Sequence, residues 1–132
     1  MNSANKIFAE ISVGELLDKI SILEIKQNNL NDKEKIKIVS KELESLKNTL
    51  EKNVQLTDEI KSLYKNLKDI NIKLWGIEDA KRDCERNKNF GESFIQLARS
   101  VYLENDNRAK IKNKINILSG SNLLEVKSYD KY

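Results

Sequence analysis

The chain has 132 residues, of which 34% are charged and 39% hydrophobic, and its formal net charge is +3. This length fits one domain, and no linker rich in Pro, Gly or Ser divides it, so we expect residues 1–132 to form a single unit. Histidine is absent, which excludes histidine-based triads and almost every zinc site. The single cysteine, Cys84, has no partner for an internal disulfide.

The charge pattern and the first residues bear on location and partners. No apolar run approaches the roughly 20 residues that a membrane span needs, and residues 1–10 lack the apolar core of a secretory signal. Together with the lone cysteine, these features predict a cytoplasmic protein. The 24 basic and 21 acidic residues are intermixed, so nucleic acid is an unlikely partner, because the basic residues form no continuous stripe.

The first predicted helix covers residues 12–29. Ser12 and Glu15 have the spacing of a capping box, in which the two side chains satisfy free N–H groups at the helix start. Apolar residues then recur at helical spacing, which predicts one buried face. These residues are Val13, Leu16, Leu17, Ile20, Leu23 and Leu30.

The second and third predicted helices cover residues 32–53 and 57–87. Asn31 or Asp32 can cap the second helix, and Thr57 can cap the third. Both carry apolar residues at alternating spacings of three and four, which is typical of a coiled-coil seam. A short loop joins them, so we expect these two helices to pack against each other as an antiparallel hairpin. The seams are Ile36, Val39, Leu43, Leu46 and Leu50, then Ile60, Leu63, Leu67, Ile70, Leu74 and Ile77.

The fourth predicted helix covers residues 92–119 and ends before Gly120, a residue type that often terminates helices. Its seam is apolar at both ends, but its central inward positions fall on Asn105, Arg108 and Lys112 or Ile111. The tail, residues 120–132, is expected to pack back on the bundle through its apolar side chains. These are Leu123, Leu124, Val126 and Tyr129.

These elements predict an all-α fold. Antiparallel helical hairpins form a four-helix bundle with coiled-coil-like heptads and a short docked C-terminal tail. The rival architecture is an extended hairpin that forms a homo-oligomer through the second and third helices, because their seams are long enough for either arrangement.

A polar cluster between the third and fourth helices is the main candidate site. In an antiparallel pair joined near Asn89, Asn71 lies opposite Arg108 and Arg82 lies opposite Leu97. Inward Asn and Arg residues cost stability unless they are paired or hold a ligand, and arginine matches carboxylates and phosphates. The alternative is a solvated face with weak ion pairs. The candidate ligand-binding residues are Trp75, Glu78, Arg82, Arg99, Tyr102, Asn105 and Arg108.

Carboxylates provide a weaker metal hypothesis. Acidic residues that project inward from several helices of a bundle can hold a divalent ion such as Mg²⁺. Only one E-x-x-D motif, from Glu15 to Asp18, opens beside a core stripe, and no matching E-x-x-E completes the set. The candidate ligands are Glu15, Asp18, Asp79 and Asp106.

Three segments resemble an uncharacterised all-α domain family known from bacteria and marine phages. They read S-V-G-E-L-L-D-K-I from Ser12, L-W-G-I-E-D-A-K-R from Leu74 and L-A-R-S-V-Y-L-E-N-D-N-R-A from Leu97. The resemblance implies no activity, although it suggests an association with glycosyltransferase or surface-polysaccharide genes. It highlights positions within the polar cluster and adds Asp18, Lys19 and Tyr129, so Lys19 joins the candidate ligand-binding residues.

Three functions remain open. The first is a small cytoplasmic binding or accessory protein that recognises an anionic small molecule or a partner protein through the polar cluster. The second is a Mg²⁺-dependent enzyme acting on a nucleotide or a phosphorylated sugar. The third is a structural coiled-coil adaptor. The sequence leaves open whether the protein is an enzyme.

Overall fold

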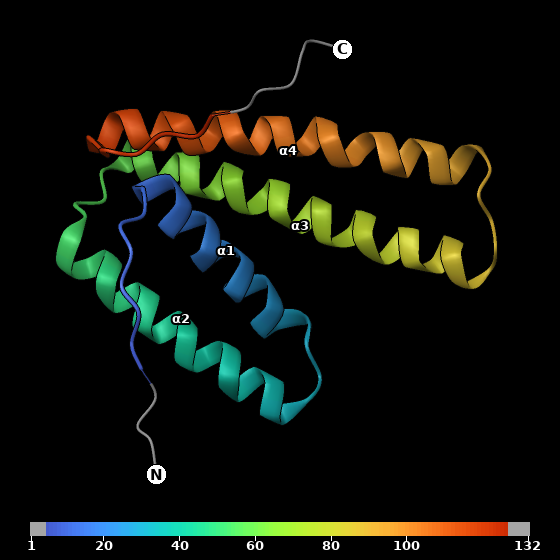
Figure 1. Ribbon diagram of the computed structural model, residues 1–132, viewed down its shortest axis with the longest axis horizontal. Coiled ribbons are helices and arrows are strands. Elements are labelled where there is room, and N and C mark those ends of the chain that lie inside the picture. Colours follow the sequence, from blue (N-terminus) through green and yellow to red (C-terminus); the bar gives the residue numbers. More distant parts are fainter. Residues whose placement is uncertain (1–4, 127–132) are drawn as a thin grey trace.

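A computed structural model describes residues 5–126 and shows four α-helices (Figure 1). They are α1 (Val13–Asn29), α2 (Lys33–Asn53), α3 (Asp58–Arg86) and α4 (Glu92–Ser119). The all-α four-helix prediction is confirmed, and every helix end lies within one residue of its expected place. None of the helices in this part of the chain has the length and apolar character that crossing a membrane requires.

Local capping explains where the helices begin and end. Ser12, Asp32 and Thr57 each accept a hydrogen bond from a backbone N–H in the first turn of α1, α2 and α3, respectively. Such caps satisfy donors that have no partner within the helix. α4 has no side-chain cap, and it ends at Gly120, whose φ of 71° is a left-handed conformation that favours glycine.

Helix α1 is the centre of the molecule and packs against all three other helices. α3 and α4 form the longest hairpin, whereas α2 packs against α1 alone. The expected pairing of α2 with α3 is therefore wrong. Each seam is buried in part, that of α2 against α1 and that of α3 where α3 packs on α1 and α4, because a heptad pattern defines an apolar face and not the helix that covers it. The core combines residues of these seams, such as Leu43 and Leu67, with the buried face of α1, including Leu17, and with Ile115 of α4.

The α1–α2 hairpin is shorter than the α3–α4 hairpin. Figure 1 shows α1 ending about midway along α3 and α4, so their far halves project as a two-helix arm. We call residues 78–101 the arm. Its interior is thin: Cys84 is buried, and Phe90 packs edge-to-face on Phe94 with ring centroids 5.5 Å apart.

The tail docks on α4 through polar groups. The side chain of Asn113 donates to the backbone carbonyl of Glu125 (2.9 Å) and accepts from its N–H (2.7 Å). The apolar packing predicted for the tail is not observed within residues 120–126, where Leu123, Leu124 and Val126 are all exposed. Tyr129 lies outside the described residues.

Candidate functional site

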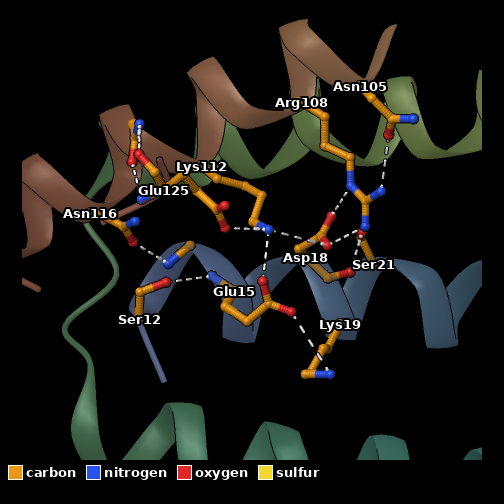
Figure 2. A network of polar contacts seen from close by, with 12 residues as sticks. Ser12, Glu15, Asp18, Lys19, Ser21, Asn105, Arg108, Lys112, Asn116 and Glu125 are labelled. Atoms are coloured by element: carbon orange, nitrogen blue, oxygen red, sulfur yellow. Dashed lines mark hydrogen bonds and ion pairs between the residues drawn. The ribbon is translucent and has the colours of Figure 1, made fainter. Parts of the chain in front are cut away.

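A buried charged cluster joins α1, α4 and the tail (Figure 2). We call it the clasp; its members are Glu15, Asp18, Arg108, Lys112 and Glu125. Asp18 is only 1% exposed. Arg108 binds it with two nitrogens, Nε to Oδ1 at 2.9 Å and Nη2 to Oδ2 at 2.5 Å. This fork geometry is the strongest form of an ion pair between side chains.

Lys112 is the second cation of the clasp. Its Nζ donates to Glu125 at 2.6 Å and to Glu15 at 2.7 Å, and it lies 3.8 Å from Asp18. Burial disfavours the charged ammonium, but the hydrogen bonds that it donates to Glu125 and Glu15 outweigh this effect and hold the pKa of Lys112 above its usual value. The hydrogen bond with Asp18 likewise raises the pKa of Arg108. Both cations therefore stay charged.

Asn71 and Ser21 complete the shell of Asp18. Asn71 Nδ2 donates to Asp18 Oδ1 at 2.9 Å and to Ser21 Oγ at 2.7 Å, while Ser21 Oγ donates to the Asp18 carbonyl. The expected proximity of Asn71 and Arg108 is thus observed, with both donating to one oxygen of Asp18. A buried carboxylate needs this many donors to offset its desolvation.

Gly14 allows α1 to approach α4 closely enough to form the clasp. Its N–H donates to Asn116 Oδ1 at 2.6 Å. A Cβ at this position would lie 2.5 Å from the Lys112 carbonyl oxygen and 2.7 Å from Asn116 Oδ1. No residue with a side chain fits here without displacing backbone.

The capping box predicted at Ser12 is half formed. Ser12 Oγ accepts from the Glu15 N–H at 3.0 Å, but the Glu15 carboxylate binds Lys112 and, at 3.8 Å, Lys19. One sequence signal pointed to the clasp: Gly14, Asp18, Ser21 and Ile25 recur at helical spacing, and all four are buried. A carboxylate on such a buried face requires a cation from another helix.

A groove lies beyond the clasp, where α1 ends and the arm begins. We call it the arm groove, and its volume is about 430 Å³. It brings together Trp75, Glu78, Arg82 and Arg108 from the predicted cluster. The complete lining consists of residues from α1, α3 and α4, namely Ile22, Ile25, Asn71, Leu74, Trp75, Glu78, Asp79, Arg82 and Arg108.

The other predicted ligand-binding residues lie outside the arm groove. Asn105 contacts it indirectly, because its Oδ1 accepts from Arg108 Nη1 at 3.2 Å. Arg99 donates to Gln96 on the exposed side of α4, and Tyr102 is 43% exposed. Lys19 lies with Glu15 on the other side of the clasp. The prediction grouped Arg99, Tyr102 and Asn105 with the groove residues because it assumed a site between α3 and α4 alone, whereas α1 forms one wall; Lys19 was added on the family resemblance.

The two arginines of the arm groove differ in their exposure and in their partners. Arg82 Nη1 donates to Glu78 Oε2 at 2.9 Å, and both side chains are largely exposed. The hydrogen bond from Arg82, helped by Lys81, lowers the pKa of Glu78. Arg108, in contrast, is fixed by Asp18. The groove therefore combines an exposed arginine, Arg82, with a second arginine that Asp18 holds, beside the indole of Trp75 and the carboxylates of Glu78 and Asp79, and Arg82 has the chemistry to bind an anion.

The carboxylates proposed as metal ligands do not converge. Between residues 5 and 126, no group of three or more Asp, Glu or Cys side chains has a geometry that could hold a metal ion. Glu15 and Asp18 accept hydrogen bonds from the cations of the clasp, and Asp79 lines the arm groove. Asp106, on α4, belongs to no such group.

The molecule is thus a four-helix protein whose first helix is locked to its last by buried charges, with a mixed groove beside that lock. Comparison with known families matches residues 7–132 to a family of unknown function (DUF6165). The chain belongs to this family. Comparisons with curated proteins and with solved structures found no match.

Proposed function

We propose that this protein is a small cytoplasmic binding protein whose arm groove holds a small anionic molecule with an apolar or aromatic part. One observation carries the proposal. Trp75, Arg82 and Arg108, from two helices, line a single cavity whose opposite wall is the apolar end of α1. Pockets for small molecules combine an apolar lining with a few convergent polar groups in this way.

The size of the groove and the exposure of Arg82 support this reading. Its volume of about 430 Å³ lies within the range of roughly 300–1,000 Å³ for small-molecule sites. Arg82 is 65% exposed, and its pairing with Glu78 is weak because water screens both groups. It can therefore turn toward a carboxylate or phosphate of the ligand. Trp75 and Leu74 supply a surface for the apolar part.

The alternatives have less support. A Mg²⁺-dependent enzyme needs free carboxylates, yet Asp18 and Glu15 are neutralised by Arg108 and Lys112. A coiled-coil adaptor needs a free seam, yet the buried residues of the α2 seam pack within the chain's own core. A partner protein is the second candidate occupant of the groove, because Ile22, Ile25 and Leu74 give its lining an apolar part. The bacterial or phage origin suggested by the sequence motifs stays part of the proposal.

Intrinsic fluorescence tests the proposal directly, because Trp75 is the only tryptophan and lines the groove. Nucleotides, sugar nucleotides and small carboxylates are screened for a change in Trp75 emission and for a rise in melting temperature, with and without Mg²⁺. A ligand at 100 times its Kd stabilises the fold by roughly 2.7 kcal/mol. We expect a hit to require no metal.

Arg82→Ala and Arg86→Ala form a matched pair for any hit. Both arginines are on α3, are equally exposed, and pair with an acidic residue one turn away, but only Arg82 lines the groove. We expect Arg82→Ala to weaken binding at least about tenfold, as loss of a charge-assisted hydrogen bond does, and Arg86→Ala to leave it unchanged. Equal effects would place the ligand elsewhere. A hit that needs Mg²⁺ would favour the enzyme, and silence across the panel would favour a protein partner.

A further inference from the structure

The arm groove holds more negative charge than its two arginines suggest. Arg108 is neutralised by Asp18, toward which its guanidinium points in Figure 2. The other charged side chains of the lining are Glu78, Asp79 and Arg82, so two carboxylates accompany one guanidinium. A ligand with only negative charge would be repelled by this excess, whereas a ligand that also carries a positive group would balance it.

The two carboxylates differ in their counterions. Glu78 binds two cations, Arg82 through Oε2 at 2.9 Å and Lys81 through Oε1 at 3.3 Å. Asp79 is exposed and, among residues 5–126, forms neither a hydrogen bond nor an ion pair. Lys81 lies outside the groove lining, so it continues to balance Glu78 when Arg82 turns toward a ligand. The groove then offers a ligand one cation, Arg82, and one anion, Asp79.

Helical spacing places these two charges beside the indole. Trp75, Asp79 and Arg82 follow one another at intervals of four and three along α3, and all three line the groove. Side chains at such intervals lie on one face of a helix, with Cβ atoms about 5–6 Å apart. The face of an indole attracts a cation more strongly than that of any other aromatic side chain. Trp75 and Asp79 therefore form a position for a cation, one helical turn from the guanidinium of Arg82.

The opposite wall of the groove is apolar. Of the residues that line the groove, α1 contributes Ile22 and Ile25, and Leu74 of α3 adds a third aliphatic side chain. Aliphatic side chains offer no hydrogen bond to a polar group, so they suit the apolar part of a ligand. A bound molecule would thus have its charged half against α3 and its apolar half against α1.

We propose that the ligand of the arm groove is a zwitterion, in which an ammonium group and a carboxylate or phosphate lie a few bonds apart on an apolar skeleton. The oxyanion binds Arg82, and the ammonium group binds Asp79 and the face of Trp75. An amino acid with an apolar side chain is the simplest molecule of this class. This inference rests on the proposed function, because it concerns the same groove and adds a positive group to the anionic ligand.

Probes that differ by one group test the position for the ammonium. L-Phenylalanine is compared with 3-phenylpropionate, which lacks the ammonium group, and with 2-phenylethylamine, which lacks the carboxylate. Phosphoethanolamine and ethyl phosphate form the corresponding pair for a phosphate. Calorimetry and Trp75 emission, excited where phenylalanine does not absorb, give the Kd values. We expect a zwitterion to bind at least about tenfold more tightly than its matched anion, as a charge-assisted hydrogen bond provides. The pair that shows this gain identifies the oxyanion as a carboxylate or a phosphate.

Two exposed aspartates of α3 provide a matched pair of variants. Asp79→Asn should abolish the gain that the ammonium group gives, and it should bind the matched anion at least as tightly as wild type does, because a like charge is removed. Asp69→Asn is the control, since Asp69 is exposed on the same helix but lies outside the groove lining, and it should retain the gain. Both substitutions are at the surface, so both variants should fold.

The outcomes distinguish this inference from the proposed function. If an anion binds and needs Arg82, but its zwitterion binds no more tightly, the zwitterion is wrong and the proposed function stands. If a zwitterion binds more tightly and Asp79→Asn retains the gain, the ammonium group lies elsewhere and the inference is again wrong. If neither the anions nor the zwitterions bind at millimolar concentration, the zwitterion is wrong together with the proposed small-molecule site.

Discussion

The clasp and the arm contain the same residue types in opposite settings. In the clasp, Asp18 is 1% exposed and its partner Arg108 lies 90 positions away in the chain. On the arm, Asp83 pairs with Arg86 and Glu85 with Lys88, each pair three positions apart in the chain and with every side chain more than 60% exposed. An ion pair between distant residues restrains the fold, whereas one within a single turn restrains only that turn.

The free energies involved differ accordingly. Exposed pairs contribute about 0–1 kcal/mol, because water screens them and ordering two long side chains costs entropy. Breaking a buried pair costs about 3–5 kcal/mol, mostly because the remaining charge is left without a counterion. Substitutions at matched positions in the two regions therefore test whether burial accounts for the difference.

The largest effect is expected for Asp18→Ala. It leaves the buried guanidinium of Arg108 without its carboxylate and removes an acceptor from Asn71. We expect the free energy of unfolding in urea to fall by about 3 kcal/mol or more. The loss of stability is smaller if Arg108 turns outward into water, because its side chain is already 27% exposed.

Asp83→Ala is the counterpart on the arm. It removes a carboxylate from an arginine in an exposed pair, and we expect a change below about 0.5 kcal/mol. If both alanine variants cost the same, the contrast between the clasp and the arm would be wrong.

The next largest effect on stability is expected at Gly14, and Gly76 is its control. Gly14→Ala places a methyl group 2.5 Å from the backbone oxygen of Lys112, so α1 must move away from α4 and the clasp must loosen. We expect a loss of about 1–3 kcal/mol, which is typical of overpacking. Gly76→Ala, inside α3, meets nothing within 4 Å and should stabilise the protein by up to about 1 kcal/mol, because alanine favours a helix. Thermal unfolding of both variants distinguishes the two signs; a neutral Gly14→Ala would show that the close approach is not needed.

The sequence predicted the helices better than their packing. Caps and heptads are local signals, so the helix starts at Ser12, Asp32 and Thr57 could be predicted from the sequence. The seams of α2 and α3 specify an apolar face but no partner, and so the central place of α1 was missed. The prediction of the candidate site shows the same difference between local signals and contacts between helices. Arg108 was predicted as an inward polar residue, and Asp18 was proposed as a weak metal ligand and as a position that the family resemblance adds. Their pairing was not predicted, because no local signal links α1 to α4.

An intermediate effect with a distinct pH dependence is expected at Glu24, which is neither fully buried nor freely exposed. Burial disfavours its charge, but the Tyr64 hydroxyl donates to it, and Lys47 and Lys68 lie at 3.4 and 3.5 Å. The net result is a pKa below the ordinary 4.5. A lowered pKa in the folded state stabilises the protein above the unfolded-state pKa, and this stabilisation is lost as the pH falls through the folded-state value.

Glu24→Gln should therefore cost about 1 kcal/mol at neutral pH, and the difference from wild type should shrink as the pH falls below 4.5. Urea unfolding at a series of pH values measures this convergence. Glu42→Gln, at an exposed position within α2, serves as the control and should give a small difference from wild type that does not change with pH. A Glu24→Gln deficit that persists in acid would assign its effect to packing and not to charge.

The smallest effect on stability is expected where the largest effect on binding is proposed. Arg82→Ala breaks an exposed pair with Glu78, so the free energy of unfolding should change by less than about 0.5 kcal/mol. Arg108→Ala, in the same groove, should reduce stability strongly because it leaves Asp18 buried without its cation. A loss of binding in Arg108→Ala thus has two explanations, whereas a loss in Arg82→Ala has one. Arg82→Ala therefore reports more cleanly on the site than Arg108→Ala does, since a folded Arg82→Ala protein with unchanged affinity removes this exposed arginine from the proposed function without disturbing the clasp.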